Sequence, residues 1–182
     1  MSDSTPAIEF VDRVVTLPEF RRLASTVDWD DHYDWTTMDA ALAASLRGTV
    51  AMAGPTVVGS TRLVGDGLRY CYVQDVLVDP EFSDQGIAST LVERLLAWIA
   101  SQGGAEVFVG LFSSPEAEGV YESLGFARPD DMAGMQRWVR PCDDLVEDSL
   151  HPLDECIAVA VGRVEAAPSS PPQPRIRHDA CG

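Results

Sequence analysis

The chain has 182 residues, and the 46% of them that are hydrophobic suffice for the core of one domain. Its formal net charge is −16, and all 13 of its basic residues are arginine. Nucleic acids and anionic membranes repel an acidic protein, so the charge argues against both as partners.

The chain begins with a predicted strand and two predicted helices. Ile8–Val15 is expected to be the first strand. Leu17–Val27 has apolar residues at helical spacing, and Met38–Leu46 is expected to be a second helix, capped by one of the two threonines before it. Between the helices, Asp28–Trp35 is dense in acidic and aromatic residues and is expected to be irregular.

The middle of the chain predicts β-structure. Thr49–Ala53 and Val57–Val64 are expected to form a hairpin around a turn at Gly54-Pro55. After a second turn at Asp66-Gly67, Leu68–Val78 is a long run of residues that favour a strand.

A helix, a strand and a second helix are predicted next. Ile87–Ser101 is amphipathic and is expected to end at Gly103-Gly104. Glu106–Leu111 is a continuous apolar run, typical of a strand buried in the centre of a sheet. Pro115–Leu124 predicts a helix, and Met135–Val139 a last strand.

The composition changes after Pro141. The sequence therefore predicts a domain over residues 1–141, an acidic extension over 142–165 and a tail over 166–182. The tail is rich in Pro, Ser and Ala, which predicts disorder. Ile157–Val161, inside the extension, is apolar enough to pack as an extra strand or short helix, or to form the contact of a homodimer.

Membrane, secreted and metal-binding classes are disfavoured. No apolar run approaches the ~20 residues of a membrane helix, and Met1–Pro6 lacks the basic and apolar segments of a secretory signal. We therefore expect a cytoplasmic protein. The four cysteines do not have the spacing of a zinc motif, and we expect no metal site.

The loop between the predicted strand Leu68–Val78 and helix Ile87–Ser101 carries the first functional signal. Gly86 has no Cβ, so a ligand can approach its backbone closely. Backbone amides at a helix start suit a phosphate or pyrophosphate. An ordinary strand-to-helix turn can also contain a glycine, so this loop alone leaves both interpretations open.

A second segment, Ala117–Phe126, reads Ala-Glu-Gly-Val-Tyr-Glu-Ser-Leu-Gly-Phe and gives the loop a context. It follows Val78–Pro80 (Val-Asp-Pro), Ser83–Ala88 (Ser-Asp-Gln-Gly-Ile-Ala) and the apolar run Val107–Leu111. In this order the segments resemble the GNAT-type N-acetyltransferase superfamily. The resemblance covers Ile8–Val139 in element order as well as motif.

The resemblance implies an acyl-CoA N-acyltransferase fold of the α/β (α+β) class, with a mixed, mostly antiparallel twisted sheet flanked by helices. It also implies acetyl-CoA as co-substrate, with its thioester in a splay between two strands. The amides of Leu77 and Val78 would pair with the pantetheine arm. The pyrophosphate would be held by the amides of Gln85, Gly86, Ile87, Ala88 and Ser89.

Tyr121 matches the general acid of the family. A phenol has a reference pKa of about 10, so it is protonated at neutral pH and can donate a proton to the leaving CoA thiolate. The alternative is that Tyr121 packs near Phe126 as an ordinary aromatic residue on a helix face.

Asp75 is the candidate general base. It is a charged residue in an apolar strand beside the expected thioester site, and strand alternation places it on the same face as Leu77. A base is needed because the attacking amine must lose a proton. The alternative is that Asp75 hydrogen-bonds a neighbouring loop.

By family analogy, the loop Asp28–Trp35 lines the acceptor pocket. Trp29, Tyr33 and Trp35 could frame an organic amine by stacking or cation–π contact. His32 could assist catalysis. The alternative is that the aromatic residues anchor the loop to the core and that His32 is solvated surface.

Two positions depart from the family pattern. Ser83 stands where the family usually has Gln or Arg, and Asp84 where it commonly has Gly. The pyrophosphate loop thus lacks a cation and carries an anion, unless Asp84 turns away to cap the helix. High salt would screen the repulsion. The acidic composition has two possible explanations. An acidic surface attracts cationic amines, or a GC-rich genome replaces Lys codons while a salt-rich cytoplasm tolerates acidic surfaces.

The expected function is N-acetylation of a primary amine by direct attack on acetyl-CoA. One alternative is a non-catalytic module of the same fold that binds acyl-CoA or another ligand, as Ser83 and Asp84 suggest. A second is a protein or peptide N-acetyltransferase. Peptide amines and small-molecule amines are therefore both candidate partners.

Overall fold

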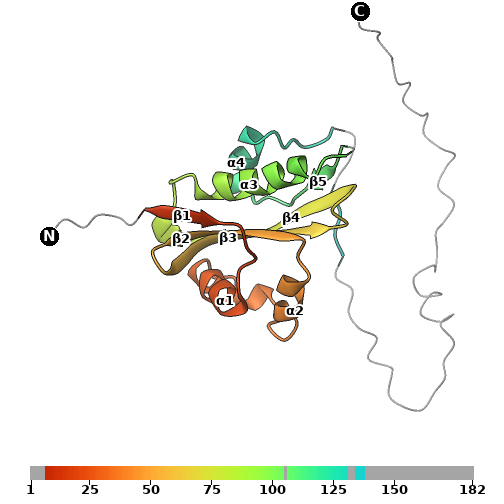
Figure 1. Ribbon diagram of the computed structural model, residues 1–182. Helices are drawn as coiled ribbons and strands as arrows, with labels where there is room; N and C mark the ends of the chain where they lie inside the picture. Colours follow the sequence, from red (N-terminus) through yellow and green to blue (C-terminus); the bar gives the residue numbers. More distant parts are fainter. Residues whose placement is uncertain (1–6, 105, 131–133, 138–182) are drawn as a thin grey trace, which may run out of the picture. The chain divides into compact units, whose positions relative to one another are not determined.

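A mixed five-stranded sheet forms the centre of the fold in the computed structural model, which describes residues 7–104, 106–130 and 134–137 (Figure 1). The strands, in their order across the sheet, are β1 (Ile8–Val11), β2 (Arg47–Ala53), β3 (Thr56–Gly65), β4 (Tyr70–Val78) and β5 (Phe108–Gly110). The first four are antiparallel to their neighbours, whereas β5 is parallel to β4. The predicted fold class is confirmed.

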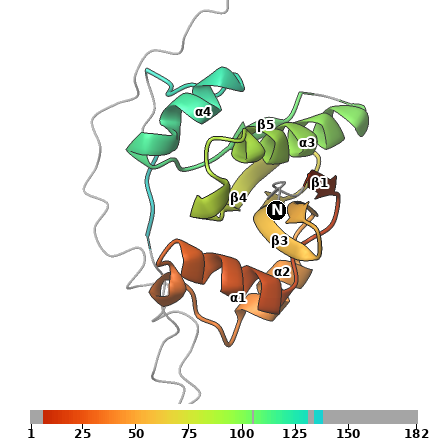
Figure 2. The ribbon, with the colours of Figure 1, turned by 90° about the vertical axis from the view of Figure 1, so that its left-hand side faces the viewer.

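Helices cover both faces of the sheet. They are α1 (Leu17–Thr26) and α2 (Met38–Ala43) on one face, and α3 (Ile87–Ser101) and α4 (Glu118–Ser123) on the other (Figures 1 and 2). Short 3₁₀ turns lie between these elements: η1 (Asp30–His32), η2 (Pro80–Phe82) and η3 (Pro115–Ala117). No helix in the described ranges is long and apolar enough to span a bilayer.

The elements predicted up to Leu124 are present, mostly with shorter bounds. The helix predicted over Ile87–Ser101 has those bounds, while the strand predicted over Glu106–Leu111 is only β5. The expectation that this strand lies in the sheet centre is wrong for the residues described. β5 ends the strand order and Phe108 is 55% exposed, because only alternate side chains of the run face α3 and α4.

The second half of the predicted C-terminal strand, and everything after it, lies outside the described residues. Of that strand, Met135–Arg137 is described and is not in a strand. By its internal contacts the chain divides into the units Met1–Gly134 and Met135–Gly182. The acidic extension, the tail and the apolar stretch Ile157–Val161 fall in the second unit and remain predictions.

A polar cap stabilises the start of α1, and an apolar face packs the helix against the sheet. Thr16 and Glu19 form a capping box, and Arg13 pairs with both oxygens of Glu19 at 2.8 Å. The Arg13 guanidinium lowers the pKa of Glu19 to about 2, so the cap stays ionised at neutral pH. Phe20 and Leu23 are fully buried against the sheet, because residues three apart share a helix face.

The start of α3 packs closely on β3. A Cβ on Gly59 would lie 2.8 Å from Cγ2 of Ile87 and 3.2 Å from Cδ1 of Leu91. Both helix residues are buried, with 2% and 0% of their surface exposed. The absence of a side chain at Gly59 therefore sets how closely the first turn of α3 approaches the sheet.

We predict that Gly59→Ala destabilises the protein by about 1–3 kcal/mol, because the added methyl group overpacks the contact with Ile87. Gly119→Ala is the matched control. Gly119 lies in α4, and a methyl group added there would have no atom within 4 Å, so alanine should stabilise by roughly 0.5–1 kcal/mol. Urea unfolding measures both. Equal effects of the two substitutions would contradict the packing argument.

Candidate functional site

The pairing of β4 with β5 stops early. Only Tyr70–Tyr72 pairs with β5, although β4 continues to Val78. From Val73 onward, no strand among the described residues pairs with this edge of β4. Part of β4 thus has an open edge on the side away from β3.

The register with β3 decides which amides face the open edge. The Asp79 N–H donates to the Val58 carbonyl at 2.8 Å. Antiparallel pairs alternate between hydrogen-bonded and non-hydrogen-bonded, so the next pair, Val78 and Gly59, is of the second kind. The N–H and C=O of Val78 therefore point away from β3, and those of Leu77 point toward it.

Left-handed backbone shapes the loop before α3. Asp84 has φ +61° and Gly86 has φ +69°. The first value favours glycine, and aspartate is among the few other residues that tolerate it. Asp84 is exposed, and α3 has no side-chain cap hydrogen bond, so the alternative that Asp84 caps the helix is wrong.

The amides at the start of α3 are free for a ligand. The helix ladder begins where the Thr90 N–H donates to the Gly86 carbonyl at 3.0 Å. The N–H groups of Ile87, Ala88 and Ser89 precede that bond and have no partner within the helix. A Cβ on Gly86 would have nothing within 4 Å, so the backbone is open on that side. Gln85 is exposed beside it.

Tyr121 lies on α4 and is 8% exposed. Its ring packs edge-to-face on Phe126 at 6.2 Å, as the packing alternative expects. Its hydroxyl has no hydrogen-bond partner among the described residues, and burial raises the pKa of Tyr121. The phenol is therefore a protonated donor at neutral pH, whose ring is held by packing.

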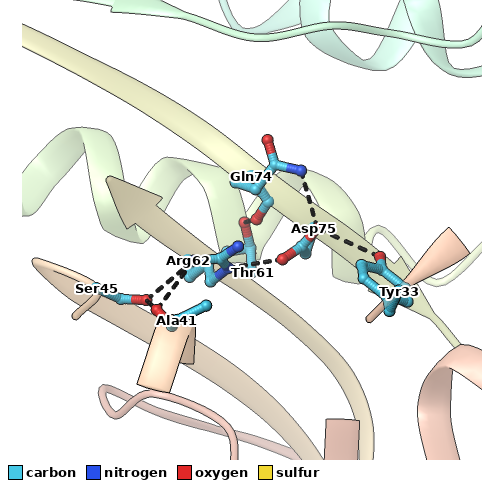
Figure 3. Close-up of polar contacts among 7 residues, drawn as sticks. All are labelled: Tyr33, Ala41, Ser45, Thr61, Arg62, Gln74 and Asp75. Carbon is cyan, nitrogen blue, oxygen red and sulfur yellow. Dashed lines mark hydrogen bonds and ion pairs between the residues drawn. The ribbon is translucent and has the colours of Figure 1, made fainter. Parts of the chain in front are cut away.

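Asp75 occupies a β-bulge and is 7% exposed (Figure 3). Its backbone is left-handed, with φ +54°. Arg62 Nε donates to Oδ2 at 2.6 Å, and Oδ1 accepts from Gln74 Nε2 at 2.9 Å and from the Tyr33 hydroxyl at 3.3 Å. The carboxylate is thus held from β3, from its own strand and from the loop between α1 and α2.

The bulge transfers the buried side chains of β4 from one face to the other. Between the pairs Ser60–Leu77 and Arg62–Gln74, β4 advances one residue more than β3. Val73 packs with α3 and α4, whereas Leu77, four residues on, packs with α1 and α2. Asp75 and Leu77 share the α1–α2 face, as predicted.

The loop expected to line an acceptor pocket has a buried and an exposed part. Tyr33 and Trp35 pack on Phe20, with ring centroids 5.0 and 6.2 Å away, so these two anchor the loop to the core. Burial, reinforced by the Asp75 carboxylate, raises the pKa of Tyr33. Trp29 is 39% exposed, and its ring centroid lies 5.8 Å from that of the exposed His32.

Comparison with known proteins identifies the family. Residues 10–126 match the profile of the Acetyltransferase (GNAT) family. The chain belongs to this family. The match contains the open edge of β4, the loop before α3 and Tyr121.

Two curated plant proteins are similar to part of this GNAT protein. GCN5-related N-acetyltransferase 1, chloroplastic, of Arabidopsis thaliana is 35% identical over 79 residues, which cover 43% of this chain and 39% of that one. Serotonin N-acetyltransferase 2, chloroplastic, of Oryza sativa subsp. japonica is 35% identical over 79 residues, covering 43% of this chain and 38% of that one. The chain therefore spans less than half the length of these relatives. Its cytoplasmic location stays a prediction.

Solved structures share the GNAT fold over most of the described chain. The GNAT family acetyltransferase SP0256 from Streptococcus pneumoniae TIGR4 is 31% identical with a TM-score of 0.64, covering 74% of this chain and 99% of that one. Aminoglycoside N-acetyltransferase AAC(6')-Iy, solved in complex with CoA, is 19% identical with a TM-score of 0.54, covering 75% and 97%. The second likeness shows the fold alone.

Sequence reasoning missed Arg62 as a site residue. It is the cation that pairs with Asp75, and 13% of its side chain is exposed. The available signal was a charged residue inside a predicted strand, and the same signal singled out Asp75. In the described part of the chain, no group of three or more His, Cys, Asp or Glu is placed to hold a metal ion.

Proposed function

We propose that this GNAT protein transfers an acetyl group from acetyl-CoA to a primary amine by direct attack. The observation that carries the proposal is the adjacency of two kinds of free backbone amide. Val78 directs its N–H to the open edge of β4, and the loop that follows leads to the free amides of Ile87–Ser89. The first suits an extended amide-bearing arm, and the second suits a pyrophosphate.

The backbone donors on β4 and at the start of α3 are of the kinds that acetyl-CoA requires. The geometry favours Val78 over Leu77 as the partner of the pantetheine arm, because the Leu77 amide points toward β3. Ile87, Ala88 and Ser89 would hold the pyrophosphate, with Gln85 and Gly86 before them. The co-substrate supplies the acetyl group as a thioester.

The reaction needs one proton acceptor and one proton donor. The cationic amine first gives one proton to the acceptor, which frees the lone pair of its nitrogen. The nitrogen then attacks the thioester carbon and forms the C–N bond, the C–S bond breaks, the nitrogen loses its second proton to solvent, and the departing thiolate gains one from the donor. Tyr121 is the proposed donor to the departing sulfur, since its phenol is protonated and has no hydrogen-bond partner among the described residues. No covalent enzyme intermediate is needed.

Asp75 is the proposed acceptor of the amine proton. A carboxylate has about four acceptor positions, and three of those on Asp75 are used by Arg62, Gln74 and Tyr33. One remains for the amine or for a bridging water. Because both oxygens are held, the carboxylate has a fixed direction at the bulge.

The acceptor is proposed to be a cationic amine in solution. The exposed Trp29 and His32, among the acidic residues of the loop, offer an aromatic surface in a negative field. The names of two relatives, a serotonin N-acetyltransferase and the histone acetyltransferase TAP1 of Glycine max, span small and protein amines. A peptide amine is therefore the second candidate acceptor.

We predict that Tyr121→Phe lowers kcat by roughly 100-fold or more while the Kd of CoA changes by less than about twofold, because only the proton donor is lost. Thiol release from acetyl-CoA with a panel of amines and peptides gives kcat, and calorimetry gives the Kd. Acetylation of peptides alone would select the peptide acceptor.

Tyr70→Phe is the control for this prediction, because Tyr70 is 59% exposed and its ring packs at a tilt on Phe108, on the part of β4 that pairs with β5. It should leave kcat unchanged. Tight CoA binding with no turnover of any acceptor by the unmodified protein would favour the non-catalytic module instead.

We predict that Asp84→Asn tightens acetyl-CoA binding about fivefold in dilute buffer, because two like charges about 4 Å apart repel by about 1 kcal/mol in water. Asparagine also tolerates the left-handed backbone at this position. At ~1 M salt the gain should fall below about twofold, because the screening length is then only about 3 Å.

Glu93→Gln is the matched control for Asp84→Asn. It removes one negative charge from the exposed face of α3, away from the loop, and should leave the affinity unchanged. Equal gains from both substitutions would show that net charge, rather than the charge at Asp84, governs the affinity.

A further inference from the structure

Arg62 joins three parts of the molecule that are distant in sequence. Its Nε pairs with Asp75 on β4, while its Nη1 donates to the Ala41 carbonyl at 3.3 Å and lies 3.4 Å from Ser45 Oγ (Figure 3). Asp75 in turn accepts from Tyr33. A chain of polar contacts therefore runs from the end of α2, through the bulge, to the loop between α1 and α2.

Burial makes this chain of contacts specific. The side chains of Arg62 and Asp75 are 13% and 3% exposed, so water cannot readily replace either partner. Asp75 is one of two acidic residues that are buried in the described part of the chain; the other, Asp79, directly follows β4. A buried ion pair with added hydrogen bonds fixes direction as well as distance.

The other anchors of the loop between α1 and α2 tie it to α1 or to the core. The Ser25 hydroxyl donates to Asp30 Oδ1 at 2.8 Å, and the Arg21 guanidinium lies 5.1 Å from the centroid of the Trp35 ring. Tyr33 and Trp35 pack on Phe20, and the Trp35 indole donates to the Asp30 carbonyl at 3.0 Å, which is a contact within the loop itself. Among the described residues, the hydrogen bond from the Tyr33 hydroxyl to Asp75 is the polar link between this loop and the sheet. The direction of the loop over the sheet therefore depends on where Asp75 is held.

We propose that Arg62 is a positioning residue that holds the acceptor side of the site through Asp75 and Tyr33. This role rests on the proposed function for its kinetic consequence. The bulge backbone has separate support, because the Thr61 hydroxyl donates to the Gln74 carbonyl at 3.3 Å and the ladder continues on both sides. Arg62 thus acts on the amine and leaves acetyl-CoA binding to the backbone amides.

The first arm of the test is hydrogen exchange of residues 28–37 in the full chain, without substrates. Arg62→Gln should speed exchange of these amides by at least about tenfold, because a charged hydrogen bond is lost. Arg62→Lys should give a smaller increase and Tyr33→Phe an increase of the same kind. If Arg62→Gln fails to fold, exchange in these two variants can still be measured.

Arg13→Gln is the matched control, since it also removes an arginine–carboxylate ion pair. The Arg13 side chain donates two hydrogen bonds to Glu19 at the start of α1. It should lower Tm without changing exchange in residues 28–37. If Arg62→Gln, or Arg62→Lys where it alone folds, changes exchange in this loop no more than Arg13→Gln does, the positioning role is wrong.

The second arm is steady-state kinetics with the amine that the unmodified protein acetylates. Arg62→Gln should raise KM for the amine at least about tenfold and leave the Kd of acetyl-CoA within about threefold, with partial recovery in Arg62→Lys. Tyr33→Phe added to Arg62→Gln should cause little further loss, because both act through Asp75. Additive losses, or a change confined to acetyl-CoA binding, would overturn the proposal.

The two arms separate this inference from the proposed function. If the unmodified protein acetylates no amine, the proposed function fails while the exchange result still decides whether Arg62 holds the loop. If the protein turns over but exchange in residues 28–37 does not respond to Arg62, the positioning role alone fails.

Discussion

The left-handed backbone at Asp75, whose buried carboxylate pairs with Arg62, is the constraint on which the site depends. One extra residue in β4 changes which face every later side chain meets. Leu77 can therefore enter the α1–α2 core although Val73 belongs to the α3–α4 core. The same residue places a carboxylate where the strand loses its partner β5.

The loop before α3 combines a conformation typical of its family with an unusual charge. Positions 84 and 86 both have positive φ, and the helix amides beyond them are free. The conformation suits the proposed pyrophosphate, whereas the exposed Asp84 would oppose it electrostatically. A chain with a net charge of −16 works against anions generally, so at the proposed site the attraction would come from the backbone amides without a side-chain cation in this loop.

Local sequence patterns predicted the helices and strands. The features that these patterns missed depend on contacts between residues distant in sequence. The period of Ile87–Ser101 and the glycines after it were sufficient for the bounds of α3. By contrast, Cys71, Val73, Asp75 and Leu77 are spaced two residues apart, like the side chains on one face of a regular strand. The sequence therefore gives no sign of the bulge. It accompanies an ion pair with Arg62, 13 residues earlier. The edge position of β5 likewise depends on strand order, which its apolar composition does not reveal.

Residue-specific amide exchange with and without CoA tests the central claim most directly, which is that the open edge of β4 and the start of α3 form the CoA site. In the free protein the Leu77 amide should be protected and the Val78 amide should exchange readily. CoA should slow exchange at Val78 and at Ile87–Ser89. Protection by CoA at other residues, with Val78 and Ile87–Ser89 unchanged, would contradict the account.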